Sequence, residues 1–198
     1  MNVTLNHLSF YKNDDAFDSL FPEKIQKLSR IHWTPLEVVK QSVSFLAPTV
    51  GTKVLDIGSG VGKFCIAGAH FAPEANFFGI EQRKELLDYA ISAKGLTGVT
   101  NAYFTNGNFT QLNFDEYDSI YFFNSFAENL YKLARIDDSI EYSTSLYIYY
   151  ANFLIKVLGS RPSGTRLVTY HGYDLEIPSC YELSQELMGG DLKMWLKK

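Results

Sequence analysis

The stretch Val54–Phe64, which reads VLDIGSGVGKF, constrains the fold more than any other part of the chain. It begins with a short apolar run that ends in Asp56, and glycines then follow at alternate positions, Gly58, Gly60 and Gly62. This pattern is typical of a buried parallel strand that turns sharply into a helix. Glycines allow positive φ angles and a close approach of the backbone to a ligand, while the first N–H groups of the helix are free donors. The stretch therefore predicts an α/β domain with a ligand site at this turn.

The spacing of these glycines differs from the two common phosphate-binding motifs. A dinucleotide fingerprint, G-x-G-x-x-G, would need its third glycine where the chain has Lys63. A P-loop would need glycine in place of Ile57 and Ser or Thr in place of Phe64. Asp56 also disfavours a pyrophosphate, because a carboxylate repels it but accepts hydrogen bonds from an ammonium group. The pattern therefore disfavours a nicotinamide dehydrogenase and predicts a ligand that carries a cation near the turn.

The D-x-G-x-G-x-G pattern from Asp56 to Gly62 resembles motif I of the class I S-adenosylmethionine (SAM) dependent methyltransferases. In that family the loop surrounds the methionine part of SAM, and an acidic residue at the end of the next strand binds the ribose hydroxyls. Asn76–Glu81 supplies such a strand, and Glu81 lies 25 positions after Asp56. The resemblance covers the chain from about residue 34 to its C-terminus, and it implies SAM as cofactor and S-adenosylhomocysteine (SAH) as product.

The same resemblance implies a three-layer α/β/α Rossmann-like fold. Its sheet would be seven-stranded and mostly parallel, and would end in an antiparallel β-hairpin. The alternating runs Cys180–Leu187 and Leu192–Leu196 predict that hairpin. Helical periodicity predicts a helix over Arg83–Ala93 with Gly95 at its C-cap, and a helix in two pieces over residues 127–158.

Thr34, at the start of a helical stretch, has two expected roles. Thr34 as N-cap, Pro35 at the first helical position and Glu37 two residues later form a capping box. In several methyltransferase families a Thr-Pro at this point lies against the methionine end of SAM, so the resemblance also implies a ligand contact. Capping alone also explains the residue.

A second cofactor contact is expected at Asn108, after the third strand. The family usually has Gly-Asp here, with the Asp accepting a hydrogen bond from the adenine amino group. Asn108 departs from that pattern, but its amide oxygen can accept the same bond, and Phe109 can stack on the adenine. A simple turn is the alternative. The resemblance thus implies these cofactor-binding residues: Thr34, Asp56, Gly58, Ser59, Gly60, Gly62, Glu81, Gln82, Asn108, Phe109 and Asn124.

Asn124, Phe126 and His171 are the catalytic candidates. Asn124-Ser125-Phe126 follows the strand Asp118–Phe123, where the family has its catalytic motif IV, and is similar to the Asn-Asn-Phe of the non-SET-domain lysine methyltransferases. An Asn oxygen can hold an amine so that its lone pair points at the methyl group, and an aromatic ring favours the developing cation. His171 follows the next strand and can orient or deprotonate the acceptor. All three can also be ordinary turn and packing residues.

We therefore expect SAM-dependent methyl transfer to an amine acceptor such as a protein lysine. A small-molecule O- or N-methyltransferase is the first alternative, and an enclosed pocket instead of an open trough over Asn124 would favour it. A SAM-binding module without transferase activity is the second. The acceptor itself, protein or small molecule, is not identified by the sequence.

Length and composition limit the number of domains. The chain has 198 residues, 46% of them hydrophobic, which suits one domain: residues 1–47 as a helical cap and residues 48–198 as the Rossmann-like core. No apolar run is long enough for a membrane span, and the start Met1–His7 does not resemble a signal peptide, so a cytoplasmic protein is expected. A net charge of −4 disfavours nucleic acid as a partner. Cys65 and Cys180 are expected as free thiols, and four scattered histidines predict no metal site.

Overall fold

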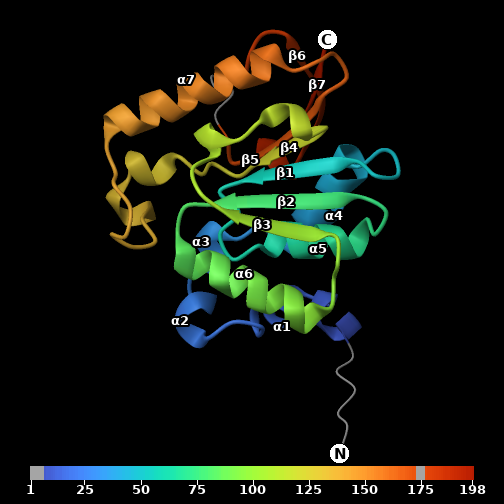
Figure 1. The fold of residues 1–198 in the computed structure, drawn as a ribbon, viewed down its shortest axis with the longest axis vertical. Helices are drawn as coiled ribbons and strands as arrows, with labels where there is room; N and C mark the ends of the chain where they lie inside the picture. The colour runs from blue at the N-terminus through green and yellow to red at the C-terminus, as the bar shows by residue number, and fades with distance from the viewer. Residues whose placement is uncertain (1–6, 173–176) are drawn as a thin grey trace, which may run out of the picture.

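A seven-stranded sheet forms the centre of the computed structural model, which describes residues 7–172 and 177–198 (Figure 1). The strands are β1 (Lys53–Ile57), β2 (Asn76–Glu81), β3 (Ala102–Asn106), β4 (Ser119–Phe122), β5 (Arg166–Tyr170), β6 (Tyr181–Leu187) and β7 (Leu192–Lys197). Their order is β3-β2-β1-β4-β5-β7-β6, and all pairs are parallel except those that β7 makes with β5 and β6. The predicted fold class and its C-terminal hairpin are confirmed.

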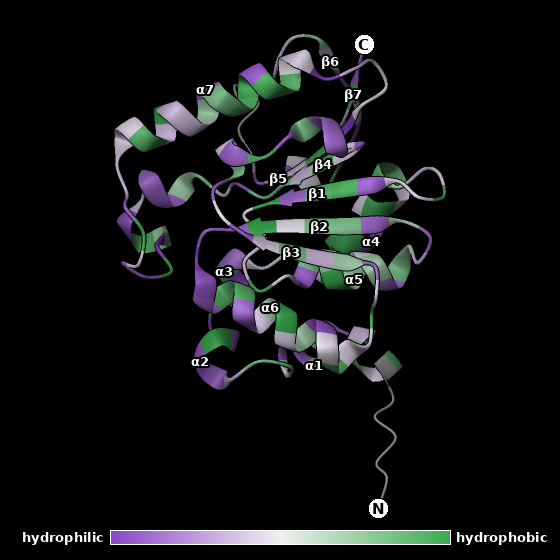
Figure 2. Cartoon of the chain, in the orientation of Figure 1, coloured by the Kyte–Doolittle hydropathy of each residue, from purple (hydrophilic) through white to green (hydrophobic). Residues whose placement is uncertain are grey.

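Helices cover both faces of this sheet. The helices are α4 (Leu36–Leu46), α5 (Lys63–Phe71), α6 (Lys84–Thr97) and α7 (Thr144–Ser160). Successive strand residues point to opposite faces, so Val54 of β1 packs in the same core as α4, α5 and α6, while Leu55 and Ile57 pack in the core with α7. Figure 2 shows hydrophobic residues along β1 and in the helices beneath it. Both faces of the central strands are therefore buried, as expected for a doubly wound sheet.

The strand order reverses beside β1. β1 pairs with β2 on one side and with β4 on the other, so the chain crosses over the sheet between these two neighbours. In open α/β sheets ligands bind at such a point, in the crevice outside the carboxyl ends of the strands. The fold thus brings the glycine loop after β1 and the segments after β2, β4 and β5 to the same edge.

Three short helices precede α4 and lie beside α6 and α5 (Figure 1). They are α1 (Asp14–Asp18), α2 (Glu23–Gln26) and α3 (Ser29–His32). Lys63, the first residue of α5, is buried between the carboxylates of Asp14 and Asp18, with Nζ 2.7 Å from an oxygen of each. This buried cation ties the N-terminal helices to the glycine loop.

The prediction of a helix over Arg83–Ala93 that ends at Gly95 is wrong at its C-terminus. Helix α6 continues to Thr97, and Gly98 ends it in the left-handed conformation with φ 75°. Gly95 lies inside the helix, where an added Cβ would meet no atom within 4 Å. A glycine can be tolerated in a helix interior, so the first of two nearby glycines is not necessarily the cap.

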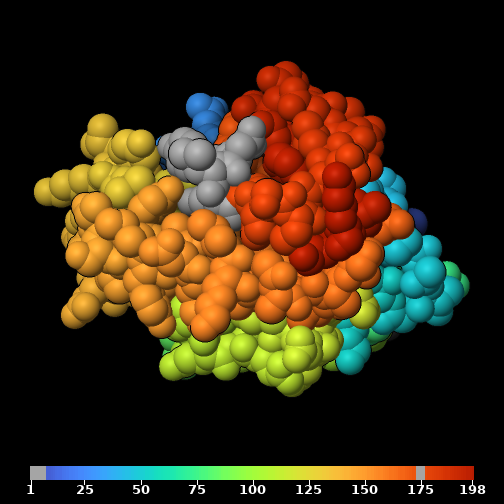
Figure 3. All heavy atoms as spheres, turned by 90° about the horizontal axis from the view of Figure 1, so that it is seen from above, coloured from blue at the N-terminus to red at the C-terminus, as the bar shows by residue number. Residues whose placement is uncertain are grey.

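The predicted two-piece helix over residues 127–158 is also wrong in its first half. Only short 3-10 turns, Ala127–Asn129 and Lys132–Ala134, occur before α7, which begins at Thr144. Side-chain hydrogen bonds hold the 127–142 segment in place of a helical ladder, as described below. Figure 3 shows this segment (yellow) projecting beside α7 (orange). Among the described residues, no helix has the length and apolar character needed to cross a membrane.

Candidate cofactor site

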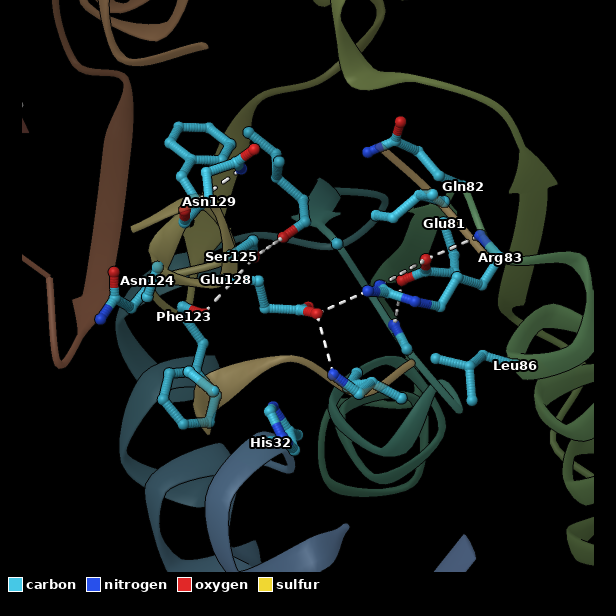
Figure 4. A pocket seen from close by; sticks show the side chains of 18 of the residues that line it. His32, Glu81, Gln82, Arg83, Leu86, Phe123, Asn124, Ser125, Glu128 and Asn129 are labelled. Atoms are coloured by element: carbon cyan, nitrogen blue, oxygen red, sulfur yellow. Dashed lines mark hydrogen bonds and ion pairs between the residues drawn. The ribbon is translucent and has the colours of Figure 1, made fainter. Parts of the chain in front are cut away.

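A cavity of about 290 Å³ lies at the carboxyl ends of β1, β2, β4 and β5 (Figure 4). Eight of the predicted site residues line it: Gly58, Gly60, Glu81, Gln82, Phe109, Asn124, Phe126 and His171. Thr34, Asp56 and Ser59 instead line a small neighbouring cavity of about 30 Å³. Gly62 and Asn108 line neither of these two. The structure thus brings most of the predicted residues to one place.

The three glycines of the loop after β1 serve different purposes. All have positive φ, at 75° for Gly58, 54° for Gly60 and 77° for Gly62. A Cβ on Gly58 would lie 2.6 Å from the Ser125 hydroxyl, and a Cβ on Gly62 would lie 2.5 Å from the Phe104 ring. At Gly60 an added Cβ would meet no atom within 4 Å. Two glycines therefore allow close packing of the loop, and Gly60 leaves open space beside the cavity.

Glu81 ends β2 and holds the glycine loop as well as lining the cavity. Its carboxylate accepts hydrogen bonds from the backbone N–H of Gly60 at 3.0 Å and of Arg83 at 2.8 Å. Only 5% of Glu81 is exposed, and this burial raises the pKa of its carboxyl group against the opposing effect of these hydrogen bonds. Each carboxylate oxygen keeps a further lone pair, so Glu81 can still accept hydrogen bonds from the hydroxyls of a sugar.

Asp56 and Ser59 lie in the small cavity as buried polar groups. Burial raises the pKa of Asp56 to about 8, because a charged carboxylate is costly to remove from water. The contact from Cys65 Sγ at 3.7 Å lowers the pKa but offsets little of this cost. The Ser59 hydroxyl is buried without a hydrogen-bond partner. Unsatisfied groups of this kind are rare in folded proteins and are found at ligand sites. Both groups are suited to a polar ligand next to the glycine loop.

The predicted capping box at Thr34 is wrong. Its hydroxyl is buried and lies 2.9 Å from the Tyr121 hydroxyl, and it makes no capping bond. The N–H of Leu36 instead donates a hydrogen bond to the Asp14 carboxylate at 2.9 Å. A side chain from α1 therefore takes the capping role, which no pattern local to Thr34 can indicate. The position of Thr34 in the small cavity remains compatible with a ligand contact.

Asn108 uses its amide oxygen locally. The oxygen accepts hydrogen bonds from the Thr110 backbone N–H at 3.0 Å and from the Thr110 hydroxyl at 2.9 Å, and so caps a 3-10 turn. Its amide nitrogen donates to Gln82 Oε1 and to the Tyr150 hydroxyl. The structure thus favours the turn over the adenine contact, because the expected acceptor is already occupied.

Phe109 and Phe126 form one wall of the cavity. Their rings are stacked with centroids 5.2 Å apart, and both rings contact Tyr150. Phe126 is only 3% exposed. The structure therefore groups Phe126 with Phe109 as a packed aromatic wall.

Asn124 and His171 stand at the ends of adjacent parallel strands. Each lies two residues beyond the registered pair Phe122 and Thr169. Both have positive φ, 36° for Asn124 and 50° for His171, and the Oδ1 atom of Asn124 is buried without a hydrogen-bond partner. Such backbone conformations cost about 1–3 kcal/mol each and cluster at functional sites. His171 Nδ1 lies 3.2 Å from Asp191 Oδ1, which orients the imidazole.

Arg83 is the main site residue that the sequence did not reveal. Its guanidinium is buried and reaches Glu128 Oε2 at 2.5 Å, Asp137 Oδ1 at 3.2 Å and the Tyr142 hydroxyl at 2.5 Å. Figure 4 shows Glu128 pointing toward Arg83, with Asn124 and Phe123 on its other side. Burial opposes the charged form, but the carboxylates of Glu128 and Glu81 outweigh it and raise the pKa of Arg83.

These contacts fix the 127–142 segment over the cavity. Glu128 also accepts hydrogen bonds from the Ile136 backbone N–H and the Tyr142 hydroxyl, and half of the residues from Ala127 to Tyr142 line the cavity. The pairing of Arg83 with Glu128 joins residues 45 positions apart, and an arginine two residues beyond a strand gives no sign of its partner. Among the described residues, no group of three or more His, Cys, Asp or Glu side chains is placed to hold a metal ion.

Comparison with known proteins agrees with this geometry. Residues 48–144 match a family described as Methyltransferase domain. The fold is similar to an RNA methyltransferase from Salinibacter ruber in complex with SAH, with a TM-score of 0.55, 20% identity, and coverage of 83% of this chain and 92% of that one. It is also similar to the magnesium protoporphyrin IX methyltransferase of Synechocystis PCC 6803 with bound SAM, with a TM-score of 0.61, 16% identity and full coverage of both chains.

A SAM-dependent methyltransferase from Aquifex aeolicus is similar as well, with a TM-score of 0.54, 16% identity, and coverage of 89% of this chain and 96% of that one. No curated protein sequence matches the chain. At these identities the structural likeness establishes the fold, and the two acceptors named for these proteins, RNA and magnesium protoporphyrin IX, differ from each other.

Proposed function

We propose that the chain is a class I SAM-dependent methyltransferase and that it methylates the nitrogen of an amine acceptor such as a protein lysine. The observation that carries this proposal is the unpaired, buried Oδ1 atom of Asn124, at a strained position on the cavity wall. An acceptor-only oxygen without a partner is suited to an incoming N–H donor.

The residues present fit the cofactor. Glu81 supplies a carboxylate for sugar hydroxyls, Gly60 leaves room for close approach, and the unpaired Ser59 hydroxyl lies beside the loop. When bound, SAM would supply an activated methyl group that an amine lone pair can attack, so that the N–C bond forms as the C–S bond breaks and SAH leaves. The aromatic wall of Phe109 and Phe126 offers a flat apolar surface for a purine.

The chain's own task is then to position the acceptor. Asn124 Oδ1 can accept a hydrogen bond from the amine and so direct its lone pair, while His171 at the adjacent strand end can hold a proton. The similarity of Asn124-Ser125-Phe126 to the Asn-Asn-Phe of non-SET-domain lysine methyltransferases supports a lysine acceptor. The Phe126 ring, stacked on Phe109 in the cavity wall, would favour the cation that develops on the acceptor nitrogen.

A small-molecule acceptor is the second candidate. The 127–142 segment and the N-terminal residues Ile31, His32 and Trp33 border the cavity from two sides. Small-molecule sites are typically concave in this way. The two candidates differ in the size of the methylated product.

The test uses SAM with a labelled methyl group, added with the purified protein to cell extract. We expect label on lysine Nζ in the protein fraction. Asn124→Ala should lower the rate of labelling by about 10–100-fold, the effect of losing one or two hydrogen bonds to a group that carries or develops charge. Asn152→Ala, an exposed position on α7, serves as the matched control and should keep the label. Label in the small-molecule fraction would favour the second candidate, and binding of SAH without any labelling would indicate a SAM-binding module.

A further inference from the structure

A second cavity, of about 460 Å³, lies between the N-terminal helices and the ends of β4 and β5. Ile31, Trp33, Phe123 and His171 line both this cavity and the cofactor cavity. The two spaces therefore share a wall, and that wall carries the imidazole of His171. Phe123 also borders the small cavity that contains Asp56, so it stands where all three meet.

The charges around the second cavity are unequal. Three carboxylates line it, from Asp14, Asp15 and Asp18, against the two cations of Lys63 and Arg30. Lys63 is occupied by Asp14 and Asp18, at 2.7 Å from each. Asp15 is exposed, and its carboxylate has no ion pair or hydrogen bond with any residue that the structure describes. The cavity therefore has one negative charge in excess, which disfavours a phosphate group and favours a cation.

The walls of the cavity are suited to an alkylammonium chain. Trp33, Phe123 and Tyr170 supply apolar and aromatic surface, with the rings of Phe123 and Tyr170 4.8 Å apart. The same surroundings already accommodate one ammonium group, because Lys63 Nζ lies 5.8 Å from the Trp33 ring and 5.5 Å from the Phe17 ring. Long amine side chains bury their methylene groups on such surfaces, and aromatic faces attract their charge.

We propose that the acceptor reaches the methyl group through this second cavity as an alkylammonium chain, and that Asp15 selects its charge. This inference rests on the methyl transfer proposed above. The chain would lie between Trp33 and Phe123 and bring its nitrogen to the shared wall. The ammonium gives up one proton before its nitrogen can donate a lone pair, and the His171 imidazole is placed to receive that proton, because Asp191 engages its Nδ1 and leaves Nε2 as the acceptor.

The test measures binding, so it does not depend on the natural acceptor. Two SAH analogues carry nitrogen in place of sulfur and bear a three-carbon chain that ends in either an ammonium or a hydroxyl group. At low ionic strength we expect calorimetry to show the ammonium form binding about fivefold more tightly, the range of an exposed ion pair. Asp15→Asn should remove most of this difference, and Arg30→Gln should increase it.

Asp88→Asn is the matched control, since Asp88 is an exposed carboxylate on α6 that pairs with Lys84 away from the cavities. It should leave the preference unchanged. Equal affinity of the two analogues for the unaltered protein, or a preference that survives Asp15→Asn, would overturn the inference. In either case, intact SAH binding would still support the proposed function. Failure of the unaltered protein to bind SAH would contradict the proposed function as well.

Discussion

The two sides of the cofactor cavity are built by different means. On the side of β1 and β2 the backbone makes the site: Gly58 and Gly62 have no room for a side chain, and Glu81 binds the loop through the N–H of Gly60. On the side of β4 and β5 the side chains make it. There Asn124 and His171 adopt strained backbone conformations, and a network around Arg83 holds an irregular segment.

This difference predicts how each side fails. Where the site depends on close packing, an added side chain destabilises it, because folded interiors leave few voids and cannot take up extra volume without strain. A site held by a buried ion-pair network is damaged by the loss of one charge, because the partners are then left unpaired.

Arg83→Met should have the largest effect. Removing one partner of a buried ion pair costs about 3–5 kcal/mol, because Glu81 and Glu128 lose their cation. The 127–142 segment can open to water instead, so we expect faster amide hydrogen exchange there and SAH binding weaker by about tenfold or more. Hydrogen exchange and calorimetry measure the two effects.

Arg161→Met is the control for this variant. Arg161 is also buried, bonded to the Asp115 carboxylate at 2.8 Å and to the Tyr117 carbonyl at 2.6 Å, and lines none of the three cavities described above. Its loss should lower stability without changing exchange in the 127–142 segment. Equal weakening of SAH binding by both variants would contradict the special role of Arg83.

Two glycine substitutions should separate packing from binding. Gly62→Ala places a methyl group 2.5 Å from the Phe104 ring at φ 77°, and left-handed strain with overpacking should cost about 2–5 kcal/mol. Gly60→Ala adds only strain of about 1–2 kcal/mol, but its methyl group takes the open space beside the cavity. We expect thermal unfolding to show the larger loss for Gly62→Ala, and SAH titration to show lost binding for Gly60→Ala. Normal SAH binding by Gly60→Ala would place the ligand elsewhere.

Counted per unit of pH, the smallest expected effect is a pH dependence at Asp56. With its pKa raised to about 8 from 3.8, Asp56 binds a proton more tightly in the folded chain than in the unfolded one. Stability should therefore fall as pH rises from about 4 to 8, where this contribution levels off. A ligand ammonium beside Asp56 favours the carboxylate, so SAH affinity should rise over pH 6 to 8, by up to about tenfold per unit. Calorimetry over this range should show the slope vanish in Asp56→Asn, and an unchanged slope would exclude Asp56 as its source.

The first side of the cavity could be predicted from the sequence because its parts are close along the chain. Asp56, the three glycines and Glu81 all lie in two consecutive strands and one loop, and glycines at alternate positions after a buried strand are typical of a tight turn that approaches a ligand. The seven-stranded, mostly parallel sheet and its antiparallel hairpin followed from the same family resemblance. Local backbone requirements thus made this side predictable.

The second side could not be predicted because distant segments meet there. Arg83 pairs with Glu128 across 45 positions. Outside this side, a contact between distant residues of the same kind lets Asp14 cap α4 in place of Thr34. The position of Asn124 followed from the end of β4, but its strained φ and unpaired oxygen depend on packing that no local pattern encodes. Phe123 was expected only as part of a strand, and no local pattern indicates that it borders all three cavities.

The most direct test of the account is calorimetric titration with SAH of the unaltered protein, Glu81→Ala and Glu85→Ala. Glu85 is an exposed carboxylate of α6 that pairs with Lys24 and serves as the control. We expect micromolar binding that Glu85→Ala keeps and that Glu81→Ala weakens by about 10–100-fold, the range of one or two hydrogen bonds to a charged group. Failure of the folded, unaltered protein to bind SAH, or equal binding by Glu81→Ala, would contradict the assignment of this cavity to the cofactor.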